Sequence, residues 1–158
     1  MRNLFFNLFN KTPQPVKRGP LGLHQHAAFT LDTLTFRLSA RFLTQLPAEE
    51  YTIAASSVIE AGAGCRIYRY YTSGDEFLQI NTTGGMEREN IDDIKLFIYQ
   101  DSFGITSEKQ WQKEIGAALI GRPSLQWNER DWIRIFNENE VGNVEPVYLL
   151  EHVENNQN

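Results

Sequence analysis

Cysteine and long hydrophobic runs are what the sequence most clearly lacks. Cys65 is the single cysteine among 158 residues, which excludes an intrachain disulfide and a metal site built from several thiolates. A membrane-spanning helix needs about 20 apolar residues, and the apolar opening of the chain is shorter and interrupted by asparagines. No small-residue cleavage site follows, as a secretory signal would require. We therefore expect a protein whose stability comes from a buried core.

An excess of positive charge is also absent. The formal net charge is −5, the wrong sign for a nucleic-acid-binding surface. The glycine pairs Gly84-Gly85 and Gly62-x-Gly64 lie in predicted turns rather than before a helix, so they do not indicate a phosphate site. No catalytic or cofactor-binding motif stands out. Whether the protein is an enzyme stays open, with a non-enzymatic protein favoured and no cofactor expected.

The charge that is present is unevenly distributed. Residues 1–20 carry four basic side chains and no acidic one. The rest of the chain holds the other 11 of the 15 basic residues and all 20 acidic ones, a net charge of −9. Three prolines between positions 12 and 20 favour an extended spacer. We predict an amphipathic tip and linker at 1–20, a single globular domain at 21–153 and a polar tail at 154–158.

The first eleven residues have an amphipathic pattern. On a helix, most of their apolar side chains would share one face opposite the asparagines, with only Phe6 out of place. So short a helix is marginal in water. It would form only against a membrane surface, a protein partner or the protein's own body, and otherwise the segment stays a loose end. The residues predicted to contact an anionic membrane or a partner are Leu4, Phe5, Leu8, Phe9, Lys11, Lys17 and Arg18.

Short strands separated by turn residues dominate the body. The clearest hairpin joins strands at 51–61 and 65–72 through Gly62-Ala63-Gly64, and aromatic residues on both faces predict that its second arm is central. A capping box of Ser107 and Gln110 predicts a helix after Ile105 that ends at Gly116, with Trp111 and Ile115 on its buried side. A further helical turn is predicted at 41–45, ended by Pro47. The other predicted strands cover 28–31, 34–38, 77–82, 94–100, 125–127, 132–136 and 146–153.

These elements predict the class of fold. Strands outnumber helices and follow one another through short turns, without crossover helices. The fold class is therefore α+β, mainly β: an antiparallel, meander-type sheet with one or two packed helices.

Several segments together resemble a known family. They are LGLHQHAAFTLDTLTFRL, IYRYYTSGDEFLQINTTGG, NIDDIKLFIYQDS and the tryptophan helix EKQWQ, and in this order they resemble the YjfK-like bacterial proteins of unknown function. The resemblance covers residues 21 to about 153. It implies a cytoplasmic bacterial protein, often encoded near membrane-associated or envelope-stress genes, and supplies no catalytic residues. It also implies that relatives run further at the C-terminus than Asn158.

Other candidate groups have simpler structural interpretations. His24 and His26 would share one face of a strand, but nothing places a third ligand near them, so no metal site is predicted. Asp92 and Asp93 would point to opposite sides of an extended chain, which suits a solvated turn, and contact with an arginine would give a structural ion pair. Cys65 suits a core thiol. The candidates for cross-strand packing, rather than for nucleic-acid stacking, are Tyr68, Tyr70, Tyr71, Phe97 and Tyr99.

Two hypotheses about function follow from the sequence. The first is a non-enzymatic adaptor or interaction module, cytoplasmic or peripheral at the inner membrane, whose tip contacts an anionic membrane surface or a protein partner. The second is a small-ligand-binding protein or enzyme with a pocket between the sheet and the Trp111 helix.

Overall fold

The structure is a computed structural model that describes residues 16–34, 38, 46, 48–99, 102, 104–114, 121–127, 129–134, 141–144 and 148–154. Its contacts group into two compact units. The first contains the described residues up to Ile98 and from Glu151 onward, and the second runs from Tyr99 to Leu150. Most of the predicted tip lies outside the described residues, and the single domain at 21–153 stays a prediction.

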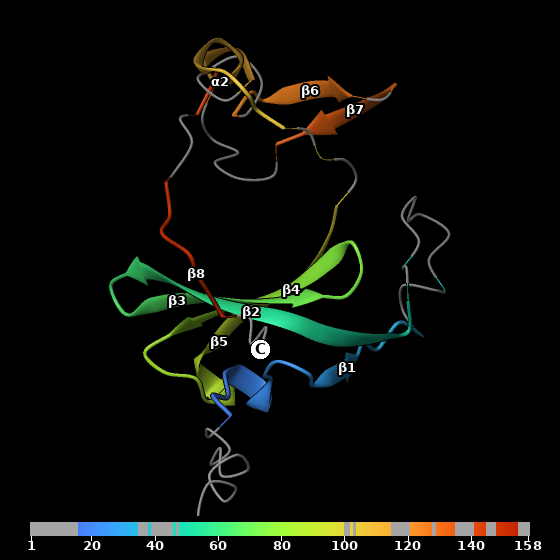
Figure 1. Cartoon of the computed structure of the whole chain (residues 1–158), viewed down its shortest axis with the longest axis vertical. Helices are drawn as coiled ribbons and strands as arrows, with labels where there is room; N and C mark the ends of the chain where they lie inside the picture. The colour runs from blue at the N-terminus through green and yellow to red at the C-terminus, as the bar shows by residue number, and fades with distance from the viewer. Residues whose placement is uncertain are drawn as a thin grey trace, which may run out of the picture. The chain divides into compact units, whose positions relative to one another are not determined.

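The first unit is built on a six-stranded antiparallel sheet. Its first five strands are neighbours in chain order, which confirms the mainly β, meander-type prediction, and a short last strand returns to pair with the second (Figure 1). Two short 3₁₀ turns, Pro20–Gly22 and Arg88–Asn90, lie outside the strands. The strands are β1 (Ala28–Thr30), β2 (Glu50–Gly62), β3 (Cys65–Thr72), β4 (Glu76–Thr83), β5 (Ile91–Ile98) and β8 (His152–Glu154).

The β2–β3 hairpin forms as the sequence predicts. Gly62 pairs with Cys65 across the turn, and the two residues between them, Ala63 and Gly64, have φ angles of 51° and 78°. Two consecutive positive φ angles give a turn whose twist matches that of the strands. The predicted central position of β3 is also confirmed, since it lies between β2 and β4.

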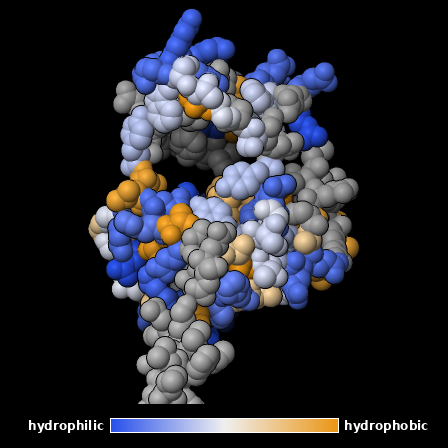
Figure 2. Space-filling view, viewed as in Figure 1, coloured by the Kyte–Doolittle hydropathy of each residue, from blue (hydrophilic) through white to orange (hydrophobic). Residues whose placement is uncertain are grey.

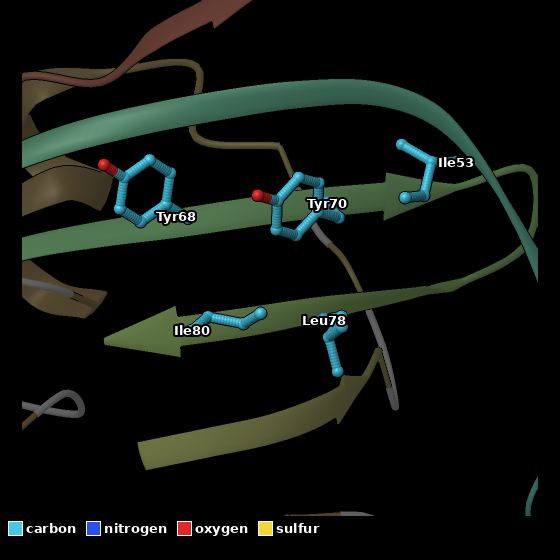
Figure 3. Packing of buried hydrophobic residues seen from close by; sticks show 5 residues of the cluster. All are labelled: Ile53, Tyr68, Tyr70, Leu78 and Ile80. Atoms are coloured by element: carbon cyan, nitrogen blue, oxygen red, sulfur yellow. The ribbon is translucent and has the colours of Figure 1, made fainter. Parts of the chain in front are cut away.

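The core covers one face of this sheet. Tyr68 and Tyr70 alternate along β3, and Leu78 and Ile80 lie opposite them on β4. Ile53 of β2 completes the cluster, and Figure 3 shows all five side chains on the same side of the strands. Ile53 and Ile80 are fully buried. We call this side of the sheet the core face.

A bulge in β2 divides that strand into two parts. Ile53 pairs with Thr72 and Ala55 pairs with Tyr71, so Ala54 is an extra residue on β2. A bulge of this kind shifts the alternation of side chains by one position. The side-chain amide of Gln25 donates a 2.8 Å hydrogen bond to the carbonyl oxygen of Ala54. The bulge thus has a hydrogen-bond partner from outside the ladder.

The second unit contains a short helix and a two-stranded hairpin. α2 (Glu108–Glu114) begins with the predicted cap, in which the Gln110 N–H donates to the Ser107 hydroxyl at 3.2 Å. The Gln110 side chain reaches back to the N–H of Thr106 at 3.0 Å. The predicted second hairpin is present as β6 (Ser124–Trp127) and β7 (Arg130–Ile133). The packing of helices on the sheet stays a prediction.

Two predicted strands differ from the structure. Leu34 and Leu38 are helical instead of extended, and the side chain of Asp32 accepts a 3.1 Å hydrogen bond from the N–H of Leu34, as a helix-capping residue does. Of the strand predicted at 146–153, residues 148–151 lie outside any strand. Strand pairing begins at His152, the first residue of β8. The predictions for 41–45, Pro47, Ile115 and Gly116 fall outside the described residues.

The core predicts a matched pair of stability changes. Ile80 and Ile94 face each other across β4 and β5, yet Ile80 is 0% exposed and Ile94 is 46% exposed. Ile80→Ala should lower the free energy of unfolding by about 2–5 kcal/mol because it leaves a cavity. Ile94→Ala should cost about 1 kcal/mol or less. Urea denaturation monitored by tyrosine and tryptophan fluorescence measures the free energy of unfolding of both variants. Equal decreases would contradict a core in which Ile80 is buried and Ile94 is not.

Candidate functional site

The core face of the first unit carries a cavity of about 610 Å³. Its lining combines apolar and aromatic side chains with a small number of charged groups. The lining residues are Lys17, Arg18, Gly19, Leu23, Ser56, Ser57, Val58, Glu60, Arg66, Tyr68, Tyr70, Met86, His152 and Glu154.

Strand register explains why these residues meet. Val58 lies opposite Tyr68, and Ser56 lies opposite Tyr70, so their side chains share the core face. On the other edge of β2, Val58 pairs with His152 and Ser56 with Glu154. Alternate residues of β8 therefore extend the same face. Residues 17–19 and Leu23, which precede β1, supply the remaining wall.

The hydroxyl of Tyr70 is buried without a hydrogen-bond partner among the described residues. The Tyr70 side chain is 2% exposed, and burial, followed by the influence of Tyr68, raises the pKa of its phenol above the ordinary value of 10. The group therefore stays a protonated donor. Gly19 makes its position possible, because a Cβ atom at residue 19 would lie 2.1 Å from the Tyr70 hydroxyl oxygen. An unpaired buried hydroxyl is costly and calls for an explanation.

The charges at the cavity do not cancel. Lys17 pairs with Glu154 at 2.6 Å, and Arg66 pairs with Glu60 at 2.8 Å. Arg18 has no ion-pair partner within the described part of the chain, and the lysine and arginine side chains of the lining outnumber its carboxylates by three to two. This is a local positive site on a protein whose net charge is −5.

A second polar cluster lies on the opposite face of the sheet, around Glu151. Its carboxylate accepts hydrogen bonds from the hydroxyl of Ser57 and from that of Tyr71 at 2.5 Å. Arg69 donates to the same carboxylate at 3.1 Å and lies 5.5 Å from the ring centre of Phe77. We call these residues the Glu151 cluster. It attaches the chain just before β8 to the centre of the sheet.

The Glu151 cluster holds a charged carboxylate. Burial by itself raises the pKa of Glu151, but hydrogen bonds from Ser57 and Tyr71 and the charge of Arg69 outweigh it, so the pKa lies below its ordinary value. For Tyr71, burial and the neighbouring carboxylate raise the pKa. Glu151 is therefore ionised and Tyr71 protonated at neutral pH. Glu151 and Arg69 thus form a structural ion pair, and Ser57 and Tyr71 add hydrogen bonds to its carboxylate.

The predicted site residues are dispersed in the structure. Lys17 and Arg18 lie at the cavity, whereas Leu4, Phe5, Leu8, Phe9 and Lys11 fall outside the described residues. His24 and His26 do not share a strand, because His26 lies in a turn with a φ of 67°. Within the described ranges, no three His, Cys, Asp or Glu residues are grouped to hold a metal.

The two aspartates near the start of β5 serve separate structural contacts. Asp92 accepts a 2.8 Å hydrogen bond from the hydroxyl of Thr83, and Asp93 pairs with Lys95. Neither of these contacts involves an arginine. Cys65 is half-buried on the face opposite the core, with its sulfur 3.4 Å from the Thr83 hydroxyl oxygen. It is thus not part of the core that the sequence predicted for it.

The aromatic residues divide between the two faces of the sheet. Tyr68 and Tyr70 belong to the core face. On the opposite face Phe77 packs between Tyr71 and Phe97, at centroid distances of 5.4 and 4.9 Å, while Tyr99 is 52% exposed. The cross-strand packing that the sequence predicts is present. Among the residues coloured in Figure 2, hydrophobic ones reach the visible surface in patches between hydrophilic ones.

Sequence reasoning missed the cavity and Glu151. The signal for the cavity was present in part, since Lys17 and Arg18 were singled out for their charge. Glu151 is one of 20 acidic residues and has no distinguishing neighbours in the sequence. Its partners come from β2 and β3, at sequence separations of 80 residues or more.

Comparison with known proteins shows which family the chain belongs to. A family described as "Protein of unknown function (DUF2491)" matches residues 4–158, and the chain belongs to it. The chain is also 55% identical to the uncharacterized protein YjfK of Escherichia coli strain K12, over 98% of this chain and 72% of the relative. The predicted family resemblance is thereby confirmed. No solved structure matches the chain.

One further observation bears on membranes. Across the residues that the structure describes, no helix has the length and apolar character needed to cross a bilayer.

The lowered pKa of Glu151 predicts a pH-dependent stability. A carboxylate with a lowered folded-state pKa adds stability above its ordinary pKa of 4.5, and that stability is lost as the pH falls through the folded-state value. Glu151→Gln should therefore lower the free energy of unfolding by about 1.5–3 kcal/mol at neutral pH. The difference from the wild type should shrink toward zero as the pH falls below 4.5 and through the lower folded-state pKa.

Urea denaturation at a series of pH values measures this difference. The matched control is Glu60→Gln, which breaks the ion pair with Arg66, whose side chains are 65% and 45% exposed. That change should lower the free energy of unfolding much less than Glu151→Gln does, because solvent screens so exposed a pair. A difference for Glu151→Gln that stays constant with pH would rule out an ionised Glu151 as the source of the stability.

Proposed function

We propose that the chain is a non-enzymatic binding protein that holds a small organic molecule in the cavity on the core face. The observation that carries this proposal is the cavity itself, which has a volume of about 610 Å³ and is lined by aromatic, apolar and charged side chains of the first unit.

The size and lining of the cavity support this proposal. Pockets for small molecules have volumes of roughly 300–1,000 Å³, with a mostly apolar lining and a few placed polar groups. The cavity of about 610 Å³ combines Tyr68, Val58, Leu23 and Met86 with charged groups in that manner. It differs from the pocket suggested by the sequence, because Trp111 belongs to the second unit and every lining residue belongs to the first.

The chemistry at the cavity favours binding over catalysis. Ser57 is hydrogen-bonded to a carboxylate, as a nucleophile next to a base would be. However, its register partner is Arg69, so its side chain lies on the face opposite the cavity. The serine–carboxylate pair is therefore directed away from any bound molecule.

A cavity-filling variant tests the proposal. Ser56→Trp places a large side chain in the cavity, and Thr52→Trp places one at an exposed position of the same strand. A library of small acids, amines and neutral compounds would be screened by ligand-observed NMR. Compounds that bind the wild type should bind Thr52→Trp equally and lose binding to Ser56→Trp, with circular dichroism confirming that both variants are folded. Absence of binding, or equal binding to Ser56→Trp, would refute the proposal.

A second candidate function is that of an adaptor whose tip contacts an anionic membrane surface or a protein partner, in the cytoplasm and peripherally at the inner membrane. The amphipathic pattern of residues 1–11 and the uneven charge favour it. Each well-placed basic residue adds about 1 kcal/mol near an anionic surface. Because Lys17 is already paired with Glu154, Arg2, Lys11 and Arg18 supply the remaining attraction. Binding should therefore be weak and sensitive to salt.

Vesicle co-sedimentation tests the second candidate. The double change Phe5→Ser with Phe9→Ser removes apolar side chains from the predicted face, and Phe6→Ser removes one from outside it. The full chain should co-sediment with anionic vesicles at low salt, and the double variant should not, while Phe6→Ser should resemble the wild type. Binding to neutral vesicles alone, or no binding by the wild type, would exclude an electrostatically assisted membrane contact.

A further inference from the structure

The lining of the cavity also indicates which chemical class of molecule fits it, a step that depends on the proposed binding function. The floor is formed by the rings of Tyr68 and Tyr70 beside Val58, and Figure 3 shows the two rings side by side along β3. Apolar and aromatic surfaces of this kind favour a ligand with an apolar body.

One cation at the cavity is available to a ligand. The charges of Lys17 and Arg66 are compensated by Glu154 and Glu60, whereas Arg18 has no such partner among the described residues. A guanidinium group can donate two parallel hydrogen bonds to one carboxylate. A single uncompensated guanidinium therefore matches a ligand with a single negative charge.

The Tyr70 hydroxyl does not add a second donor for the ligand. Gly19, the residue after Arg18, packs against it so closely that a Cβ atom at residue 19 would lie 2.1 Å from the hydroxyl oxygen, and the oxygen is closed to solvent. The donor that the lining offers to an acid group is therefore the guanidinium of Arg18, and carboxylate oxygens are acceptors that suit it.

We infer that the ligand is a small amphipathic carboxylate, with its acid group at Arg18 and its apolar body against the apolar lining around Val58 and Tyr68. A cationic amine would be repelled by Arg18. A dianionic phosphate would meet the carboxylates of Glu60 and Glu154 with only one uncompensated cation to offset its charge. A neutral alcohol of the same shape would leave the guanidinium without its partner.

Matched pairs of acids and alcohols test this inference on the full chain. The probes are 4-phenylbutyrate and decanoate, each compared with the alcohol of the same carbon skeleton in isothermal titration or NMR titration. Each acid should bind at least about tenfold more tightly than its alcohol. Arg18→Gln should remove most of that preference without changing the affinity for the alcohols.

The matched control is Arg88→Gln, an exposed arginine of the same unit that does not line the cavity. It should leave the preference for acids unchanged. That result would show that the preference comes from a contact with Arg18 and not from positively charged side chains of the protein in general. Equal binding of acid and alcohol, both lost in Ser56→Trp, would overturn the carboxylate inference while supporting a binding cavity. Binding of neither series would also overturn it, and the compound library would then decide separately on the proposed function.

Discussion

The extra residue in β2 determines which side chains reach each face of the sheet. Before Ala54 the core side carries Tyr51 and Ile53, and after it the core side carries Ser56 and Val58. Without the bulge, the second half of β2 would turn Ser57 toward the cavity and Ser56 away from it. The cavity and the Glu151 cluster therefore both depend on this single shift in register.

Strand β8 links the two faces although it is only three residues long. Its pairing with β2 directs His152 and Glu154 to the cavity. The residue just before it, Glu151, is held on the opposite face by Ser57, Arg69 and Tyr71. Because the Glu151 cluster fixes the start of β8, it also fixes the wall of the cavity.

Local patterns explain how much could be predicted from the sequence. The β2–β3 turn, the alternation along β3 and the Ser107 cap each depend on residues close in sequence, and each was predicted correctly. The strand expected at 34–38 was wrong because apolar residues four apart also suit a helix, and the cap from Asp32 favours the helix. The bulge, the partner of β8 and the role of Glu151 depend on contacts across 80 or more residues or on strand register, which no short pattern records.

The wall of the cavity joins parts of the chain made at very different times during synthesis. Lys17 and Glu154 are separated by 137 positions, whereas strands β1 to β5 need only residues up to Ile98. On a ribosome that releases the chain from its N-terminus, the meander can pair before β8 has emerged. The wall of the cavity is complete only once β8 has paired with β2, so every residue of the sheet's first five strands is made before the cavity can close.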